Sequence, residues 1–244
     1  MSKFWDILSK KHKELLAESP DYRRHVANRY FTDPAINDTH GIKRFYLYVA
    51  SHMAIPDFDD PLHGNPFFVE IEGKRITQDL LHSFLELNFL SRLDFSKIEG
   101  VVETGAGYGR TAYVLLKKYV HLKYTIVDIE PALSLSKRFL TQQFPDRDIK
   151  FLTPEEAGYA RGDLYLFISI LSELTREEMQ RYLFLAVEHA KYIYIKDWTK
   201  YRNADDDFEF YFAKARLNIP KEFFVLKFAD CSYPPGFTEG LYGK

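Results

Sequence analysis

The hydrophobic pattern changes near residue 98, and this change divides the chain into two parts. From there on, short β-branched and aromatic runs alternate with stretches whose apolar positions recur every three or four residues. The first pattern is typical of strands and the second of amphipathic helices. The predicted strands cover 99–104, 123–128, 149–153, 163–169, 190–196 and 222–228, and the predicted helices 108–120, 131–143, 175–189 and 205–216. This alternation predicts an α/β fold, with a mostly parallel sheet and helices on both faces.

Two strands of this pattern carry further information. The run from Leu164 to Ile168 is apolar throughout, as expected for a central strand that is covered on both faces. The last segment, 236–244, is short and rich in glycine. Glycine weakens strands, so we expect any final strand there to be weak or irregular.

The first third of the chain reads as helical instead. Helical spacing is present in 1–20, 21–31, 41–53 and 77–93, with a proline-rich loop at 54–67 and a short hairpin at 67–76 that turns at 72–74. Thr77 is a suitable N-cap, with Asp79 in the first turn. The sequence contains no clear linker, so we expect residues 1–96 to form a helical cap over the ligand crevice of an α/β domain at 97–244.

A glycine-rich turn joins the first predicted strand of the α/β part to its helix. The sequence Glu103-Thr104-Gly105-Ala106-Gly107-Tyr108-Gly109-Arg110 places an acid before three alternate glycines. Such a turn lets a ligand approach the backbone and face the amides of the helix N-terminus. A dinucleotide fingerprint needs a small residue at the position that Arg110 occupies, so that motif does not fit. A carboxylate before the turn suits a ligand with a cationic end.

A second acid follows at the end of the next strand. Asp128 lies 19 residues after Gly109 and closes the run Tyr124-Thr125-Ile126-Val127. A carboxylate in this place can accept hydrogen bonds from both hydroxyls of a ribose.

These motifs resemble class I S-adenosylmethionine-dependent methyltransferases over roughly residues 97–230. More narrowly, E-T-G-A-G-Y-G-R-T-A-Y, I-V-D-I-E-P-A-L and D-L-Y-L-F-I-S-I-L-S-E-L are similar to a bacterial family of sugar O-methyltransferases, as are Gly64-Asn65-Pro66 and Ile76-Thr77-Gln78-Asp79-Leu80. The fourth strand departs from that family, because Phe167 and Ile168 stand where its members carry small polar residues. The resemblance implies a Rossmann-like class I fold with S-adenosylmethionine as cofactor.

The resemblance also implies a cofactor site. Its residues would be Glu103, Thr104, Gly105, Ala106, Gly107, Tyr108, Gly109, Arg110, Asp128, Ile129 and Thr153. Glu103 would face the cationic methionyl part, or else cap nearby amides. Arg110 would pair with a carboxylate, either of the cofactor or of the protein. Asp128 would hold the ribose, and Ile129 would contact the adenine face. Thr153 would lie at the adenine edge, or serve as N-cap for the residues after it.

Candidates for the acceptor side follow the fourth and fifth strands. A sugar hydroxyl is a poor nucleophile while protonated, so a base within hydrogen-bond reach would help. Asp197, Glu173 and His63 are the candidates, His63 because it lies in the proline-rich loop, which we expect to act as a lid. Asp197 has an alternative role as a cap for the following helix. Trp198 would either stack on a sugar or fill the sheet edge.

The sequence predicts no metal site. Asp205-Asp206-Asp207 is the one tempting group of acids, but consecutive acids before Phe208 are typical of a solvated helix N-terminus. No constellation with the ligand spacing of known metal sites is present.

Composition excludes several classes of protein. The hydrophobic fraction of 46% supports a sizeable core, and the net charge of −2 provides no basic field for nucleic acid. The single cysteine, Cys231, fits a reducing compartment. No apolar run has the length of a membrane span or a secretory signal, so we expect a soluble cytoplasmic protein.

The predicted function is therefore O-methylation of a sugar or another small hydroxylated acceptor. One alternative is a catalytically inactive module that binds a nucleoside or a partner protein. Another is an NAD(P)-dependent oxidoreductase, which Glu103 and Arg110 disfavour.

Overall fold

The computed structural model describes residues 19–25, 38–203, 208–233 and 235–244. The helix predicted in 1–20 therefore lies almost wholly outside the described residues. Of the helix predicted in 21–31, the described part is α2 (Tyr22–His25).

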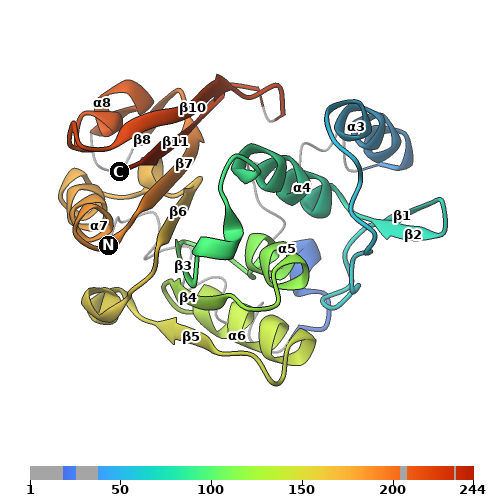
Figure 1. Ribbon diagram of the computed structural model, residues 1–244. Helices are drawn as coiled ribbons and strands as arrows, with labels where there is room; N and C mark the ends of the chain where they lie inside the picture. Colours follow the sequence, from blue (N-terminus) through green and yellow to red (C-terminus); the bar gives the residue numbers. More distant parts are fainter. Residues whose placement is uncertain (1–18, 26–37, 204–207, 234) are drawn as a thin grey trace.

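A seven-stranded sheet forms the centre of the molecule (Figure 1). Its strands are β3 (Gly100–Thr104), β4 (Lys123–Val127), β5 (Ile149–Leu152), β6 (Leu164–Ile168), β7 (Tyr192–Trp198), β10 (Phe224–Asp230) and β11 (Phe237–Gly243). They lie in the order β10-β11-β7-β6-β3-β4-β5. The five strands from β3 to β7 are parallel, whereas β11 runs antiparallel to both β7 and β10. The predicted α/β fold with a mostly parallel sheet is confirmed.

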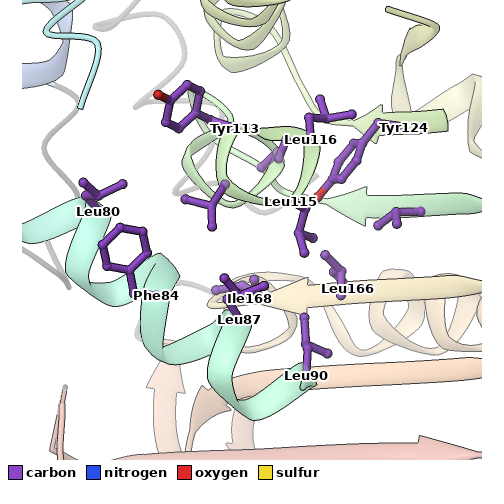
Figure 2. Close-up of a cluster of buried hydrophobic side chains, with 14 of the residues drawn as sticks. Leu80, Phe84, Leu87, Leu90, Tyr113, Leu115, Leu116, Tyr124, Leu166 and Ile168 are labelled. Carbon is purple, nitrogen blue, oxygen red and sulfur yellow. The ribbon is translucent and has the colours of Figure 1, made fainter. Parts of the chain in front are cut away.

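Helices cover both faces of this sheet because its strands alternate their side chains. Val101 and Leu166 point into one core, which includes side chains of α4 (Gln78–Leu90), α5 (Arg110–Lys118) and α6 (Ala132–Gln143). Val102 and Tyr165 point into the other, which includes side chains of α7 (Arg176–His189) and α8 (Phe212–Arg216). Figure 2 shows the first core, where the apolar side chains of α4 meet those of α5 and β6.

The final strand corrects the sequence-based expectation. β11 is seven residues long and pairs with β7 along its whole length, from Phe237 opposite Trp198 to Gly243 opposite Tyr192. Its glycines make room for large neighbours. A Cβ on Gly240 would lie 2.5 Å from the Tyr242 hydroxyl, and one on Gly243 would lie 2.8 Å from the side chain of Leu226. These glycines therefore allow close packing within the sheet, rather than weakening the strand.

The helix predicted at 205–216 is also wrong. β8 (Lys200–Asn203) and β9 (Phe208–Tyr211) form an antiparallel hairpin, and α8 is only five residues long. Residues 204–207, with the three aspartates, lie outside the described residues. Within β9, Glu209 is exposed and Phe210 is buried, an alternation that suits a strand.

The N-terminal part follows its predicted order. It contains α3 (Thr39–His52), the hairpin of β1 (Val69–Ile71) and β2 (Lys74–Ile76), and then α4. Thr77 caps α4 as predicted, since its hydroxyl accepts a hydrogen bond from the backbone N–H of Leu80 at 3.1 Å. Side chains of α3 and α4 belong to the same core as the sheet. The division into domains at residue 96 stays a prediction.

Short 3₁₀ turns complete the connections. They are η1 (Phe95–Lys97), η2 (Pro154–Tyr159) and η3 (Leu171–Glu173). Among the described residues, no helix has both the length and the apolar character that crossing a bilayer requires.

Candidate functional site

The glycine-rich turn lies at the carboxyl end of β3, beside the end of β4. Gly105, Gly107 and Gly109 all adopt positive φ angles, of 73°, 61° and 92°. A Cβ at Gly105 would lie 2.6 Å from the side chain of Ile170, and one at Gly109 would lie 2.9 Å from Leu140. A Cβ at Gly107 would meet no atom within 4 Å. Packing therefore explains two of the glycines, whereas the third borders open space.

Asp128 fixes this turn from the neighbouring strand. Its Oδ2 accepts a hydrogen bond from the Gly107 amide at 2.9 Å, and its Oδ1 accepts one from the Ile129 amide at 2.8 Å. Burial raises the pKa of Asp128 to about 7, and these two amides oppose the shift. A carboxylate has about four lone-pair sites, so each oxygen can accept one more hydrogen bond. The half-buried side chain can therefore hold the turn and bind two ligand hydroxyls at once.

Glu103 is buried beneath the turn. The Tyr124 hydroxyl donates a hydrogen bond to its Oε2 at 2.7 Å. Burial raises the pKa of Glu103 to about 7, although Tyr124 and Arg110 act in the opposite direction. A cationic ligand group nearby would favour the ionised form, so this carboxyl can gain its charge when such a ligand arrives.

Arg110 pairs with a carboxylate of the protein, which is one of the two alternatives left open by the sequence, and its contact with a cofactor stays a prediction. Its guanidinium forms two hydrogen bonds of 2.8 Å with Glu86 of α4. It also donates to the Ser83 hydroxyl at 2.9 Å. Glu86 accepts two more hydrogen bonds, from the Thr111 hydroxyl at 2.9 Å and from Lys196 Nζ at 3.1 Å. Glu86 therefore links the helix after the glycine-rich turn to β7.

The charges of this buried cluster depend on one another. Burial alone would raise the pKa of Glu86, but Arg110 and Lys196 bring it down to about 2. The pKa of Lys196 is raised despite burial, because Glu86 faces it. Burial, Lys196 and Arg110 together hold the pKa of His82 well below its usual value, so this histidine is neutral.

Sequence reasoning missed Glu86, Lys196 and Ser83. For Ser83 and Glu86 the available signal was position, because both lie among the buried residues of an amphipathic helix. A charged residue at a core position needs a partner. The sequence did not say which residue that partner would be.

Thr153 has the geometry of an N-cap. It follows β5, its amide donates to Glu156 Oε2 at 3.0 Å, and its carbonyl accepts from the Glu156 amide at 3.0 Å. Thr104 ends β3, and Ile129 directly follows Asp128 beside the turn. The cofactor-contacting roles of these three residues stay predictions.

Tyr108, within the turn, connects it to the N-terminal part. Its hydroxyl donates to Asp79 of α4 at 2.7 Å, and the guanidinium of Arg23 lies 4.6 Å from the centre of its ring. Arg23 in turn forms two hydrogen bonds with Asp60, of 2.6 and 2.8 Å.

Gly64 lets the ring of Tyr22 pack closely against the loop, because a Cβ at Gly64 would lie 2.6 Å from that ring. Residues 21–23 and 60–65, which we call the clasp, therefore hold Tyr108 in place.

The acceptor-side candidates are placed in two groups. Asp197, at the end of β7, is fully buried and accepts hydrogen bonds from the amides of Trp198 at 2.7 Å and Ser172 at 3.1 Å. Burial raises the pKa of Asp197 to about 6. Glu173 belongs to the same turn as Ser172, so the structure brings Glu173 and Asp197 to one edge of the sheet. The segment after Asp197 is β8, so Asp197 caps the turn η3 rather than a following helix.

His63 lies elsewhere, in the clasp. Its Nδ1 is 2.9 Å from the Tyr22 hydroxyl, and its ring is 6.2 Å from that of Phe139 on α6. Burial and the nearby Arg138 and Arg23 lower the pKa of His63. Its role as a base stays a prediction, but His63 lies in the clasp beside the glycine-rich turn rather than beside Asp197.

Trp198 lies on an aromatic cluster at the end of β7. Its ring is 4.4 Å from that of Phe237 and 5.9 Å from that of Tyr201, to which it is nearly parallel. Within the part of the chain that the structure describes, no three His, Cys, Asp or Glu residues are grouped as a metal site would require.

Solved structures with similar folds include methyltransferases. An O-methyltransferase family protein from Burkholderia thailandensis matches with a TM-score of 0.55 and 11% identity, over 68% of this chain and 57% of that one. The methyltransferase domain of bacterial CtHen1-CN matches with a TM-score of 0.51 and 16% identity, over 68% of this chain and all of that one. The pyocyanin biosynthetic protein PhzM matches with a TM-score of 0.51 and 14% identity, over 99% of this chain and 69% of that one.

These similarities show the fold: the chain has the Rossmann-like α/β fold of class I methyltransferases. The chain spans only 57% of the length of the Burkholderia thailandensis protein and 56% of that of a further match, the mitomycin 7-O-methyltransferase MmcR. No protein-family model and no curated protein matches the sequence.

Proposed function

We propose that this protein is an S-adenosylmethionine-dependent O-methyltransferase that acts on a hydroxyl of a small acceptor, most simply a sugar. One observation carries the proposal. Gly107 borders open space, and its amide is held by Asp128, whose two oxygens each keep a lone pair for a ligand. A turn that is open on one side and braced by a carboxylate suits a nucleoside with two ribose hydroxyls.

The buried carboxyl of Glu103 supports the cofactor assignment. S-adenosylmethionine, when bound, supplies a methyl group on a sulfonium, and its methionyl end also carries an ammonium. Glu103 has a pKa of about 7, so a nearby cation would shift it to the carboxylate at neutral pH. Glu103 would thereby stabilise the bound cation, while Tyr124 keeps its hydrogen bond to the same carboxylate.

The acceptor would bind over the ends of β6 and β7. Transfer would form a carbon–oxygen bond while the methyl carbon–sulfur bond of the sulfonium breaks to leave S-adenosylhomocysteine, and the hydroxyl proton would leave to a base or to water. Asp197 is the best candidate for this base by its pKa, which is about 6 and therefore close to neutrality. Glu173 lies beside it. The choice of a sugar rests on the sequence resemblance, and neutral rings also suit the aromatic cluster around Trp198.

One observation favours a second function, a nucleoside-binding module without turnover. Asp197 is fully buried, and both of its oxygens accept backbone hydrogen bonds. Such a carboxylate is engaged in structure, and a binding module would need nothing more from it.

Calorimetric titration with S-adenosylhomocysteine, NADH and NADPH tests the cofactor. We expect saturable binding of S-adenosylhomocysteine alone. Binding of NADH instead would move the protein to the oxidoreductases. A second assay then uses tritium-labelled S-adenosylmethionine with a panel of neutral monosaccharides and phenols. Cofactor binding with no labelled product from any member would favour the binding module.

A further inference from the structure

Ser169, the first residue after β6, combines two unfavourable features. Its φ angle is 54°, in the left-handed region that residues other than glycine rarely adopt. Its side chain is only 8% exposed, and its Oγ has no hydrogen-bond partner among the described residues. A strained backbone and an unsatisfied buried hydroxyl each destabilise a fold, and such features cluster at functional sites. Glycine at this position would avoid both.

The backbone around Ser169 is firmly held. Its amide donates to the carbonyl of Lys196 at 2.7 Å, and the preceding Ile168 is paired with Lys196 in the sheet. The neighbouring strand β7 therefore holds the backbone on the N-terminal side of Ser169. The hydroxyl, in contrast, contributes nothing to this arrangement.

The location of Ser169 is between the two halves of the proposed site. The side chain of the next residue, Ile170, packs against Gly105 of the glycine-rich turn. A Cβ on Gly105 would lie 2.6 Å from that side chain. Three residues on, the Ser172 amide binds Asp197 at the end of β7. In the sheet, β6 lies between β3, which carries the turn, and β7, which carries Asp197. Ser169 is thus at the place where a methyl group would pass from cofactor to acceptor.

We propose that Ser169 Oγ binds the hydroxyl of the acceptor and orients its oxygen for methyl transfer; this inference rests on the proposed function. The Ser169 hydroxyl oxygen can accept a hydrogen bond from the O–H of the acceptor, which leaves a lone pair of the acceptor oxygen free to face the methyl group. It carries no charge, so it favours a neutral hydroxyl over a carboxylate or an ammonium. Ser169 serves as an acceptor-contacting residue, and the proton is removed by another group.

Two variants separate the hydroxyl from the backbone. Ser169→Ala removes the hydroxyl and keeps the left-handed strain, whereas Ser169→Gly removes both. If the hydroxyl has no structural partner, Ser169→Ala will not lower the melting temperature of the ligand-free protein, and Ser169→Gly, which also relieves the backbone strain, will raise it by roughly 2–4 °C. Ser136→Gly is the matched control. Ser136 is a buried serine of α6 whose hydroxyl donates to the Leu133 carbonyl at 2.9 Å. Glycine there will lower the melting temperature.

The kinetic arm uses labelled S-adenosylmethionine and the monosaccharide panel. We expect Ser169→Ala to lower kcat/KM roughly tenfold, as for one lost hydrogen bond, with unchanged calorimetric affinity for S-adenosylhomocysteine. Ser136→Ala will leave both quantities unchanged. Weaker S-adenosylhomocysteine binding by Ser169→Ala would assign the hydroxyl to the cofactor and overturn the proposal.

The outcomes also distinguish this inference from the proposed function. If the wild-type protein binds no S-adenosylhomocysteine, the proposed function fails, and the inference fails with it. If it binds the cofactor but methylates nothing in the panel, the thermal arm decides. A lower melting temperature for Ser169→Ala would then mean that the hydroxyl has a structural partner, and the proposal would be wrong.

Discussion

Glu86 and Arg110 form a buried, two-pronged ion pair that joins α4 to the helix after the glycine-rich turn. The two nitrogen–oxygen distances are both 2.8 Å, and Glu86 is completely buried. Lys196 of β7 shares the same carboxylate. One acid therefore neutralises charges from the cofactor side and from the acceptor side of the proposed site.

Glu86→Gln is expected to destabilise the protein by about 3–5 kcal/mol, because it leaves Arg110 and Lys196 buried without a counter-charge. Urea unfolding followed by circular dichroism measures this. Glu209→Gln is the control, since the Lys200–Glu209 pair is largely exposed. Removing an exposed pair changes stability by about 0–1 kcal/mol. Equal effects of the two variants would contradict a special role for Glu86.

Two glycine variants of the turn should behave differently. Gly107→Ala adds a Cβ that meets no protein atom, so we expect a loss of about 1–2 kcal/mol from backbone strain alone. It should nevertheless weaken S-adenosylhomocysteine binding at least tenfold, because the methyl group enters the space proposed for the ligand. Gly105→Ala collides with Ile170 and should cost more stability. Unchanged affinity of Gly107→Ala would place the ligand elsewhere.

Asp128→Ala should weaken S-adenosylhomocysteine binding by about 1–3 kcal/mol, if the carboxylate accepts hydrogen bonds from the ribose. Isothermal calorimetry measures the loss. Asp146→Ala, at an exposed position after α6, provides the matched control and should leave the affinity unchanged. Equal affinities for the two variants would remove Asp128 from the site.

Cofactor affinity should rise with pH and level off above about pH 7. Burial raises the pKa values of Glu103 and Asp128 to about 7 in the free protein. Below that pH both carboxyls are largely protonated, and a ligand that needs their charge must displace protons. Each group then contributes at most a roughly tenfold gain per pH unit. Calorimetry across this range tests the slope, and Glu103→Gln should reduce it. A flat profile in the wild-type protein would show that neither carboxyl gains charge on binding.

The parts that could be predicted from sequence have local causes or follow from the order of the parallel strands. The glycine-rich turn and the Thr77 cap depend on residues a few positions apart. Asp128 binds the Gly107 amide from 21 positions away, but its place at the end of the next parallel strand was sufficient to predict it. Strand β11 could not be judged in this way, because its glycines are explained by the rings of Tyr242 and Tyr192. The partner of Arg110 was equally hidden, since Glu86 lies 24 residues away in the sequence.

The prediction of a helix at 205–216, where the structure has strand β9 of the hairpin β8–β9, failed for a related reason. The three acids before Phe208 are typical of the start of a helix, whereas strand β9 begins only at Phe208. The unsatisfied hydroxyl of Ser169 had no sequence signal, because serine after a strand is ordinary until its φ angle and surroundings are known.

The shared carboxylate of Glu86 also bears on how such a protein could be rebuilt. Its negative charge comes from the N-terminal third, and the two positive charges that it neutralises come from the α/β part. A fragment that begins at residue 97 would retain both cations in its interior without the anion. The N-terminal segment therefore cannot be exchanged for that of another protein as an independent module, unless the replacement brings an acid to the same place.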